Sequence, residues 1–438
     1  MTTLLTPSPA LDQREHPTAG ETSVKATSRR DKPARLVSLD AYRGAIMLFM
    51  ASGGLALPAV AANFPDDPTW QFLAFNTDHV PWVGCSLWDL IQPSFMFMVG
   101  VAMPYSIASR RAKGDSERKI VLHVLYRALV LVLLGVFLSS NWSRRTNFTF
   151  VNVLSQIGLG YAFLYLLLGR GPRVQIATLA GILFGYWLLF FLWPLPEPGF
   201  DYAGVGWKDG WQGLPGWFAH WDMNTNAAAA FDQWFLNLFP RSEPFRFNEG
   251  GYQTLNFVPS LATMILGLMA GEMLRSPRGK WHKLGWLLLA GAVCLGLGWV
   301  AGEWVCPIVK RIWTPSWVLY SAGWTFWMLA GFFWVLDIHG WRGWAFPLVV
   351  VGMNSIAMYG MAQLLKGWVR STLQIHLGPL ALPGLTHVVR PLLAMMNVSV
   401  DPVWLNDTFG PVTQSAAVLA VLWLVCLWMY RRGIFLRI

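Results

Sequence analysis

The chain has 438 residues, of which 55% are hydrophobic and 13% charged, and its formal net charge is +10. Soluble globular proteins carry about 25% charged residues, so this composition leaves too little polar surface for a water-soluble protein. The apolar residues occur in runs of about 20, the length at which a helix crosses a hydrocarbon core of roughly 30 Å. These runs lack the period of two that is typical of membrane-barrel strands. We therefore predict an all-α, polytopic membrane helix bundle.

The first 36 residues differ from the rest of the chain. Residues 1–36 are polar and contain no continuous apolar stretch, so they do not fit a signal peptide. We predict that they form a disordered cytoplasmic tail. Residues 37–438 are predicted to form one transmembrane domain with about ten spans. The predicted spans are residues 37–62, 87–108, 120–138, 150–168, 174–193, 255–274, 284–303, 317–336, 346–365 and 412–430.

Lys and Arg are distributed unevenly between the two sides that these spans define. Cytoplasmic loops carry an excess of Lys and Arg, and roughly two thirds of them fall on the inner side when the N-terminus is placed inside. This bias predicts that both termini are cytoplasmic (N-in/C-in) and that residues 63–86, 194–254 and 366–411 form extracytoplasmic loops. Because the bias also accounts for the net positive charge, the expected partner is the lipid bilayer and not a nucleic acid.

The first predicted span begins with an acid and a base. In the run Ser38-Leu-Asp40-Ala-Tyr-Arg43-Gly44, Asp40 and Arg43 are one helical turn apart and can form an ion pair. One interpretation is structural, with Ser38 as the helix cap and Asp40 favoured by the helix dipole. That interpretation does not explain Arg43, which lies where an anionic cosubstrate would arrive from the cytoplasm. Both interpretations stay open at this point.

A polar cluster surrounds the start of the second predicted span. His79 precedes this span on the outer side, and Asp89 falls in its first turn. A carboxylate beside an imidazole holds its tautomer and stabilises the cation that forms when the ring takes a proton. The N-terminal end of the span could also stabilise an oxyanion. A lone histidine is more often structural, but the nearby acid and polar residues make a catalytic His79 supported by Asp89 an equal alternative.

Further polar residues lie at the starts of later spans. Residues 249–256 precede the sixth span and residues 310–317 the eighth, both from the outer side, whereas residues 352–355 lie inside the ninth. Glu249 and Lys310 share the membrane face with His79, which would suit a polar acceptor. Gly-Ser pairs inside membrane helices more often serve close packing. The candidate substrate-binding residues are Asn76, Glu249, Asn256, Lys310, Trp313 and Asn354.

Common cofactor motifs are absent from the sequence. It contains no Walker loop, dinucleotide-binding glycine pattern or zinc-protease motif. Its four cysteines are far apart and in no metal-ligand spacing, so no metal is expected. Any chemistry is therefore expected to depend on the histidine.

The ordered set of motifs resembles the transmembrane acyltransferase family typified by heparan-α-glucosaminide N-acetyltransferase, which has bacterial relatives. The resemblance covers residues 35–365, and the set is specific although each motif alone would be weak. The matching segments are Arg35-Leu-Val-Ser38-Leu-Asp40-Ala-Tyr-Arg43-Gly44, then His79, Trp82, Leu87-Trp88-Asp89-Leu90, Pro93 and Phe95, then Glu249-Gly250, Thr254-Leu255, Gly267, Gly271, Trp313-Thr-Pro-Ser316 and Gly352-Met-Asn354-Ser355-Ile356.

The resemblance implies a two-sided reaction in a bacterial cytoplasmic (inner) membrane. Acetyl-CoA would bind from the cytoplasm as cosubstrate, and the acetyl group would pass to an amino sugar or related glycan on the extracytoplasmic side. It implies that His79 is the catalytic histidine and Asp89 its supporting acid, and that Arg43 and Asp40 help to receive CoA. An acetyl-histidine intermediate and a ternary complex with His79 as general base are both compatible with it.

The sequence also departs from the family pattern and leaves alternatives. Where the family has Asp-Pro-Glu-Gly, this chain reads Phe247-Asn248-Glu249-Gly250, and residues 194–248 match no family segment, so a heparan-type acceptor does not follow. A family that O-acylates surface glycans fits less well, because residues 45–56 of the first span contain no histidine. A multi-pass transporter for a small polar or sugar-like solute is the main alternative, although the halves show no internal repeat. The third alternative is a non-catalytic membrane component of envelope assembly. The sequence is compatible with a homo-oligomer.

Overall fold

The structure is a computed structural model that describes residues 36–208, 210–378 and 401–436. The predicted tail, residues 1–36, lies outside this range except for its last residue. Within the described range the regular elements are helices, and the one extended pairing is an isolated bridge between Val83 and Val309. The predicted all-α fold is confirmed.

Eight helical segments are long and apolar enough to cross a membrane within the described residues. The segments are Val37–Ala61, which contains α1 (Val37–Ser52) and α2 (Leu57–Ala61), Trp88–Ala112 with α4 (Ile91–Ala112), α5 (Glu117–Ser139), α7 (Pro172–Phe191), Thr254–Arg275 with α9 (Phe257–Arg275), α10 (Lys280–Trp304), Pro315–Ile338 with α11 (Pro315–Phe333), and Val403–Arg431 within α15 (Pro402–Arg431). The prediction of a polytopic membrane bundle is thus confirmed.

The remaining two predicted spans correspond to helices that differ from a straight crossing. The ninth is a pair, α12 (Phe346–Met353) and α13 (Ser355–Leu364), bent by 70°. Asn354 stands at the bend with non-helical backbone angles, and its side chain binds the backbone of Ile434 and Leu436. The fourth, α6 (Val153–Leu167), has 15 residues. Hydrophobic runs predicted both positions but not the bend, where Asn354 contacts the distant C-terminal segment.

The predicted outer loop 366–411 differs from the structure in its described parts. Residues 366–378 are helical, and α15 begins at Pro402, before the predicted start of the last span at residue 412. The carboxylate of Asp401 caps this helix by accepting from the backbone N–H of Val403, and Pro402 suits the first helical position. The cap and the proline start the helix within a segment that is too polar for a hydropathy-based prediction. Residues 379–400 lie outside the described range.

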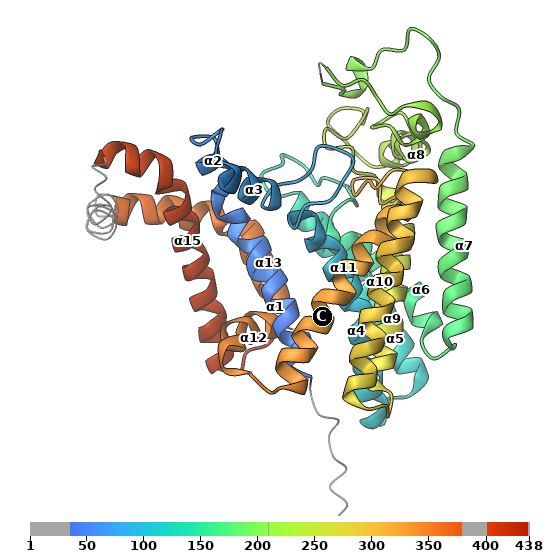
Figure 1. The fold of residues 1–438 in the computed structure, drawn as a ribbon, viewed down its shortest axis with the longest axis vertical. Coiled ribbons are helices and arrows are strands. Elements are labelled where there is room, and N and C mark those ends of the chain that lie inside the picture. Colours follow the sequence, from blue (N-terminus) through green and yellow to red (C-terminus); the bar gives the residue numbers. More distant parts are fainter. Residues whose placement is uncertain (1–35, 209, 379–400, 437–438) are drawn as a thin grey trace, which may run out of the picture. The chain divides into compact units, whose positions relative to one another are not determined.

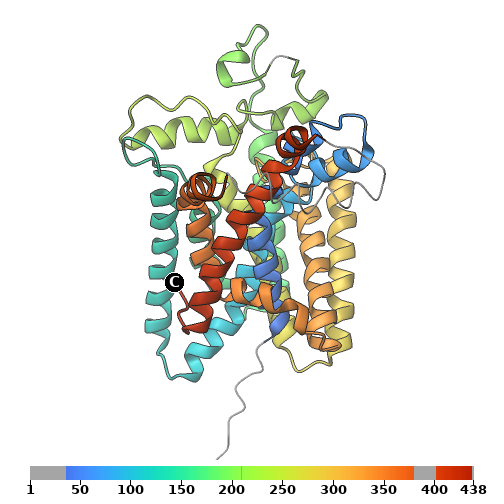
Figure 2. The same ribbon diagram turned by 90° about the vertical axis from the view of Figure 1, so that its left-hand side faces the viewer.

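The long helices run side by side between two ends of the bundle (Figures 1 and 2). α4 packs on α9, α5 on α6, and α10 on α11, while α1 packs on α12 and also contacts α4 and α11. The short α3 (Pro68–Asn76) and α8 (Ala227–Phe235) lie at the end where α1 leads into α2 (Figure 1). We call this the upper end, following Figure 1, and the opposite end the lower end.

Glycines bring two helix pairs into close contact. A Cβ on Gly44 of α1 would collide with the carbonyl oxygen of Leu348, and a Cβ on Gly352 of α12 would collide with that of Asp40. Likewise, Gly267 of α9 lies directly against the backbone of Phe97 in α4. Small residues allow such close helix approach in membranes, so the packing role that the sequence offered for the Gly352 segment matches the structure.

The start of α1 is capped by a residue that the sequence did not indicate. Ser38 was one candidate for the cap, but it lies inside α1 and makes no capping hydrogen bond. Instead, the two carboxylate oxygens of Asp337 accept from the backbone N–H groups of Val37 and Ser38 at 3.3 and 3.2 Å. Asp337 lies in η7 (Trp334–Ile338), the short helix that follows α11. The structural interpretation of Ser38 as N-cap is therefore wrong, because a distant helix supplies the acceptor.

Candidate active site

The polar loop between α3 and α4 is fixed by a reciprocal helix cap. The backbone N–H of Ser86 donates to Asp89 Oδ2 at 3.2 Å, and the backbone N–H of Asp89 donates to Ser86 Oγ at 3.2 Å. This is a capping box, in which two side chains satisfy each other's backbone groups at the start of a helix. Asp89 Oδ2 also accepts from the backbone N–H of Val80 at 3.2 Å. The Asp89 carboxylate is thereby held in one orientation and is buried.

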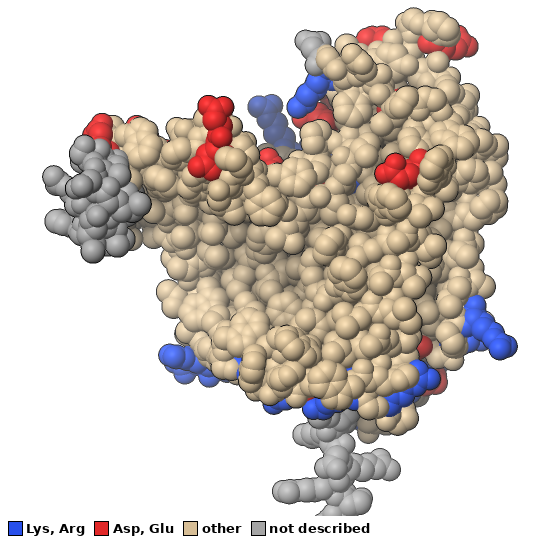
Figure 3. All heavy atoms as spheres, viewed as in Figure 1, with Lys and Arg blue, Asp and Glu red and all other residues tan. Residues whose placement is uncertain are grey.

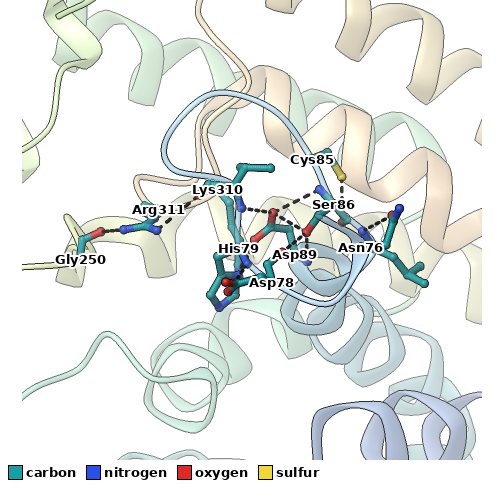
Figure 4. Close-up of polar contacts among 11 residues, drawn as sticks. Asn76, Asp78, His79, Cys85, Ser86, Asp89, Gly250, Lys310 and Arg311 are labelled. Carbon is teal, nitrogen blue, oxygen red and sulfur yellow. Dashed lines mark hydrogen bonds and ion pairs between the residues drawn. The ribbon is translucent and has the colours of Figure 1, made fainter. Parts of the chain in front are cut away.

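The second oxygen of Asp89 points to His79. His79 Nδ1 lies 2.6 Å from Asp89 Oδ1 (Figure 4). Because a buried carboxylate accepts hydrogen bonds, we assign the ring proton to Nδ1, which leaves a lone pair on Nε2. The described residues supply no hydrogen-bond partner for Nε2, and the His79 side chain is 34% exposed. His79 therefore presents an open, unprotonated nitrogen beside a buried carboxylate.

Lys310 completes a three-residue cluster at this point. Its Nζ lies 3.2 Å from Asp89 Oδ1 and 3.1 Å from His79 Nδ1. With the proton on Nδ1, the ammonium group donates to Asp89. It forms no hydrogen bond with the ring nitrogen, because both groups are then donors. Burial lowers the pKa of Lys310 to about 8, against the opposing attraction of Asp89. The cluster thus combines a carboxylate, a cation and an imidazole with almost no solvent around the first two.

Backbone pairing brings Lys310 to this site from the loop between α10 and α11. The N–H of Gly84 donates to the carbonyl oxygen of Ile308 at 2.9 Å, beside the isolated bridge between Val83 and Val309. Thr314 stabilises the turn that follows, because its hydroxyl accepts from the N–H of Val309 at 3.0 Å. Backbone hydrogen bonds therefore join the loop between α3 and α4 to the loop between α10 and α11.

Arg311 ties a third segment to the same place. Its guanidinium group donates to the carbonyl oxygens of Gly250 at 2.9 Å and Val80 at 3.4 Å (Figure 4). It also lies over the ring of Tyr252, 5.6 Å from the centroid. Asn256 holds the backbone of Arg311 by donating to its carbonyl oxygen at 2.7 Å. The loop that precedes α9 is thus bound to the His79 loop through one arginine.

The predicted substrate-binding residues occupy different positions around this site. Asn76 accepts from the backbone N–H of Leu87 at 3.3 Å and so closes the loop that carries His79. Glu249 is exposed next to Gly250. Trp313 is buried, and its indole N–H donates to Thr263 at 3.2 Å.

Of the six predicted positions, Lys310 contacts His79. Asn256 binds the backbone of Arg311, and the backbone N–H of Trp313 donates to the carbonyl oxygen of Lys310 at 2.9 Å. The structure places Asn354 elsewhere, at the bend between α12 and α13, where it binds the C-terminal segment.

Asp40 and Arg43 also lie away from His79. They pair with each other at 3.8 Å in the first turns of α1, and both make further interactions. Asp40 and Arg43 lie near the start of α1, at the lower end. From there α1 and α2 run to the upper end (Figure 1), where the loop after α3 carries His79. A contact does connect α1 with the site: Phe49 meets Trp88 edge-on with centroids 5.0 Å apart, and Trp88 lies 6.3 Å from the His79 ring.

The sequence analysis did not predict three residues that shape the His79 site and the start of α1, namely Ser86, Arg311 and Asp337. Ser86 was detectable, because Ser-x-x-Asp at a helix start is a capping-box pattern. Arg311 and Asp337 had no such local signal, since their partners lie in distant segments.

Comparison with known proteins agrees with the motif resemblance. The chain is 25% identical over 372 residues to heparan-alpha-glucosaminide N-acetyltransferase of Homo sapiens, covering 75% of this chain and 52% of the relative. It is 24% identical over 384 residues to the protein of the same name in Mus musculus, covering 78% and 55%. The chain thus spans about half the length of the curated relatives it matches. No protein-family model matches it. The resemblance predicted from the motifs is confirmed, because about three quarters of the chain is similar to two heparan-alpha-glucosaminide N-acetyltransferases.

Proposed function

We propose that this protein is a membrane acetyltransferase that uses cytoplasmic acetyl-CoA to acetylate an amino sugar or related glycan on the extracytoplasmic side. The observation that carries the proposal is the open Nε2 of His79, with Nδ1 held 2.6 Å from the buried Asp89. Similarity to proteins named N-acetyltransferases supports the reaction class.

The geometry of His79 suits acyl transfer in either of two forms. In the first, Nε2 attacks the thioester carbonyl carbon, a C–N bond forms, the C–S bond breaks and CoA leaves as the thiolate. The acceptor amine then attacks the acetyl-imidazole, loses a proton and regenerates the ring. In the second, Nε2 takes the proton from the amine while the amine attacks the thioester directly. Both need an Nε2 lone pair, and in both the Asp89 carboxylate stabilises the positive charge that develops on the ring.

The charge distribution supports an orientation for the two substrates. Lys and Arg gather along the lower end of the bundle (Figure 3). The turn between α4 and α5 and the residues just before it contain Arg110, Arg111 and Lys113. Cytoplasmic ends carry such an excess. In this orientation Arg43 and Asp40, in the first turns of α1, would face the side from which acetyl-CoA arrives. The His79 cluster at the upper end would meet the acceptor.

The upper end has features that suit a polar acceptor. Glu249 is exposed on the loop that Arg311 ties to the His79 segment, so its carboxylate is available for an amine or hydroxyl group. The segment between α7 and α9 adds exposed rings such as Tyr202 and Trp217, and aromatic rings commonly bury the apolar faces of ligands. We propose Asn76 and Glu249 as acceptor-side residues, and Asn256, Lys310 and Trp313 as residues that position the site.

Acetyl transfer by the purified protein tests this proposal. The assay measures acetyl-CoA hydrolysis and acetyl transfer to glucosamine for the wild type, His79→Ala and a control, His220→Ala. His220 lies in a different segment, between α7 and α9, and its Nδ1 lies 2.8 Å from the carbonyl oxygen of Trp193. We expect His79→Ala to lose transfer but keep acetyl-CoA binding, and His220→Ala to retain both. A folded wild type that does not bind acetyl-CoA would refute the proposal and favour a transporter.

Acid-quenched mass spectrometry distinguishes the two forms of the reaction. Incubation with acetyl-CoA and no acceptor would add one acetyl group to the peptide containing His79 if the covalent form operates. No adduct together with full transfer activity would assign the general-base form.

A further inference from the structure

Arg127 is a cation in the middle of a predicted membrane span without an acidic partner among the described residues. It lies ten residues after Glu117, the first residue of α5, which corresponds to about 15 Å along the helix axis. Its guanidinium group donates to the Tyr161 hydroxyl at 3.1 Å and lies 4.8 Å from that ring's centroid. Its Nε is buried and has no hydrogen-bond partner. Such intramembrane charges are costly and usually mark a binding or transport site.

Two more nitrogen-bearing side chains lie on the lower side of Arg127. His123 is four residues earlier on α5 and therefore on the same helix face. Arg110, from the end of α4, lies 2.8 Å from His123 through Nη2 and Nε2. Since arginine can only donate, His123 accepts here and is a neutral ring with its proton on Nδ1. Arg110, His123 and Arg127 form what we call the α4–α5 basic cluster.

The basic cluster has more positive charge than its acidic neighbour can balance. Asp115 lies 3.2 Å from Arg110 and 2.5 Å from Lys119, so one carboxylate is shared by two cations. Arg127 adds a third positive charge. Glu117 is engaged separately, by Arg111 at 2.7 Å and by the Tyr165 hydroxyl. An anion with about two negative charges would complete the cluster.

We propose that the α4–α5 basic cluster binds a phosphate group. Arginine presents several N–H donors in a planar fork that matches phosphate oxygens, and the buried Nε of Arg127 is one donor that lacks an acceptor. The phosphate belongs either to an anionic lipid of the lower leaflet or to the nucleotide part of the cosubstrate. Binding of the nucleotide part rests on the proposed function, whereas binding of a lipid phosphate does not.

A purely structural role makes a different prediction. If Arg127 serves only to bind Tyr161, its removal destabilises the protein equally in all lipids. If it binds phosphate, the wild type should gain stability when the anion is supplied, because a ligand that binds only the folded state stabilises it. Arg127→Gln and Arg110→Gln should remove that gain. Arg118→Gln is the matched control, because Arg118 is exposed in the first turn of the same helix.

The experiment measures the thermal midpoint of the full-length protein in nanodiscs. One arm compares phosphatidylcholine with a mixture containing phosphatidic acid. The other keeps phosphatidylcholine and adds acetyl-CoA or its 3′-dephospho form. We expect a rise of about 2 to 5 °C for the wild type in one arm, lost in Arg127→Gln and retained in Arg118→Gln. Because Arg127→Gln could fail to fold, Arg110→Gln provides the same comparison from the neighbouring helix.

Each outcome has a defined meaning. A gain with phosphatidic acid alone assigns the site to a lipid phosphate, and a gain that needs the 3′-phosphate of acetyl-CoA assigns it to the nucleotide. The proposal is overturned if the wild type gains stability in neither arm, or if Arg127→Gln and Arg110→Gln both keep the gain. It is also overturned if Arg118→Gln loses as much of the gain as Arg127→Gln, since attraction would then be unspecific.

Discussion

The ammonium nitrogen of Lys310 lies 3.2 Å from Oδ1 of Asp89, although 221 residues separate them in the sequence. Their side chains are 5% and 2% exposed, so the two charges meet with almost no water. The same carboxylate oxygen faces Nδ1 of His79. Lys310 therefore balances the charge of the acid that orients the histidine, and the site depends on a loop at the start of α11.

A double-mutant cycle should reveal strong coupling between Lys310 and Asp89. Lys310→Met leaves a buried carboxylate without its cation, and we expect a loss of about 3 to 5 kcal/mol in unfolding free energy. Asp89→Asn alone leaves the ammonium group unpaired. The double variant should be more stable than the sum of the single losses predicts, because neither charge remains. Thermal and chemical unfolding in detergent measures all four proteins, and simple additivity would show that the pair does not interact.

Asp89→Asn should also abolish acetyl transfer without unfolding the protein. The amide would keep an oxygen for the capping contact with Ser86 and present its NH₂ group to His79 Nδ1. That contact favours the tautomer with the proton on Nε2, so the lone pair is lost. By analogy with such tautomer changes, we expect activity to fall about a thousandfold or more.

The neighbouring Asp78→Asn is the control for this prediction. The Asp78 carboxylate accepts from the backbone N–H of His79 at 2.7 Å, and the Asp78 carbonyl oxygen accepts from Ser86 Oγ at 2.6 Å. Neither contact involves the His79 ring. Replacement of Asp78 should leave activity within a few-fold of the wild type. Equal losses in the two variants would contradict a tautomer effect.

Alanine at Gly44 or Gly352 should destabilise the packing of α1 on α12. A methyl group at either position collides with a backbone carbonyl oxygen of the other helix, which cannot move aside as a side chain would. We expect a loss of about 1 to 3 kcal/mol or more for each. Gly360→Ala on α13 is the control, because its added methyl group meets no other atom. Thermal midpoints compare the three, and an unchanged Gly352→Ala variant would show that α1 and α12 are not in close contact.

The segment between α7 and α9, which contains Asp222, should become less stable as the pH rises toward the pKa of Asp222. Burial raises the pKa of Asp222 to about 7, against donation from the backbone N–H of Leu214. Unfolded aspartate titrates near 3.9, so the folded state holds its proton more tightly. The stabilisation that comes from this tighter proton binding is fully present below about pH 4. It is lost as the pH rises to 7, and the unfolding free energy then falls by at most about 1.4 kcal/mol per pH unit.

Unfolding free energies at pH 4 to 8 measure this dependence. Asp222→Asn should flatten it, whereas Asp201→Asn, on an exposed part of the same segment, should not. Asp232 contributes in the same direction, because burial raises its pKa to about 6. A residual slope is therefore expected in Asp222→Asn, and an unchanged slope would contradict the assignment.

Local sequence determined the class of protein, the positions of its helices and one half of the candidate site. Hydrophobic runs place helices in a bilayer because their length and composition suffice, without knowledge of neighbours. His79 and Asp89 could be paired from the sequence because ten residues separate them. Ser86, three residues before Asp89, belongs to a cap pattern that is also local.

Tertiary structure alone decided the other half of the site and the roles of several predicted residues. Lys310 joins His79, Arg311 joins Gly250 to Val80, and Asp337 replaces Ser38 as the cap of α1. In each case the partner lies tens to hundreds of residues away, so no periodicity or spacing indicates it. A buried polar group takes whichever partner the folded backbone brings within hydrogen-bond distance, and that choice exists only after the helices have packed.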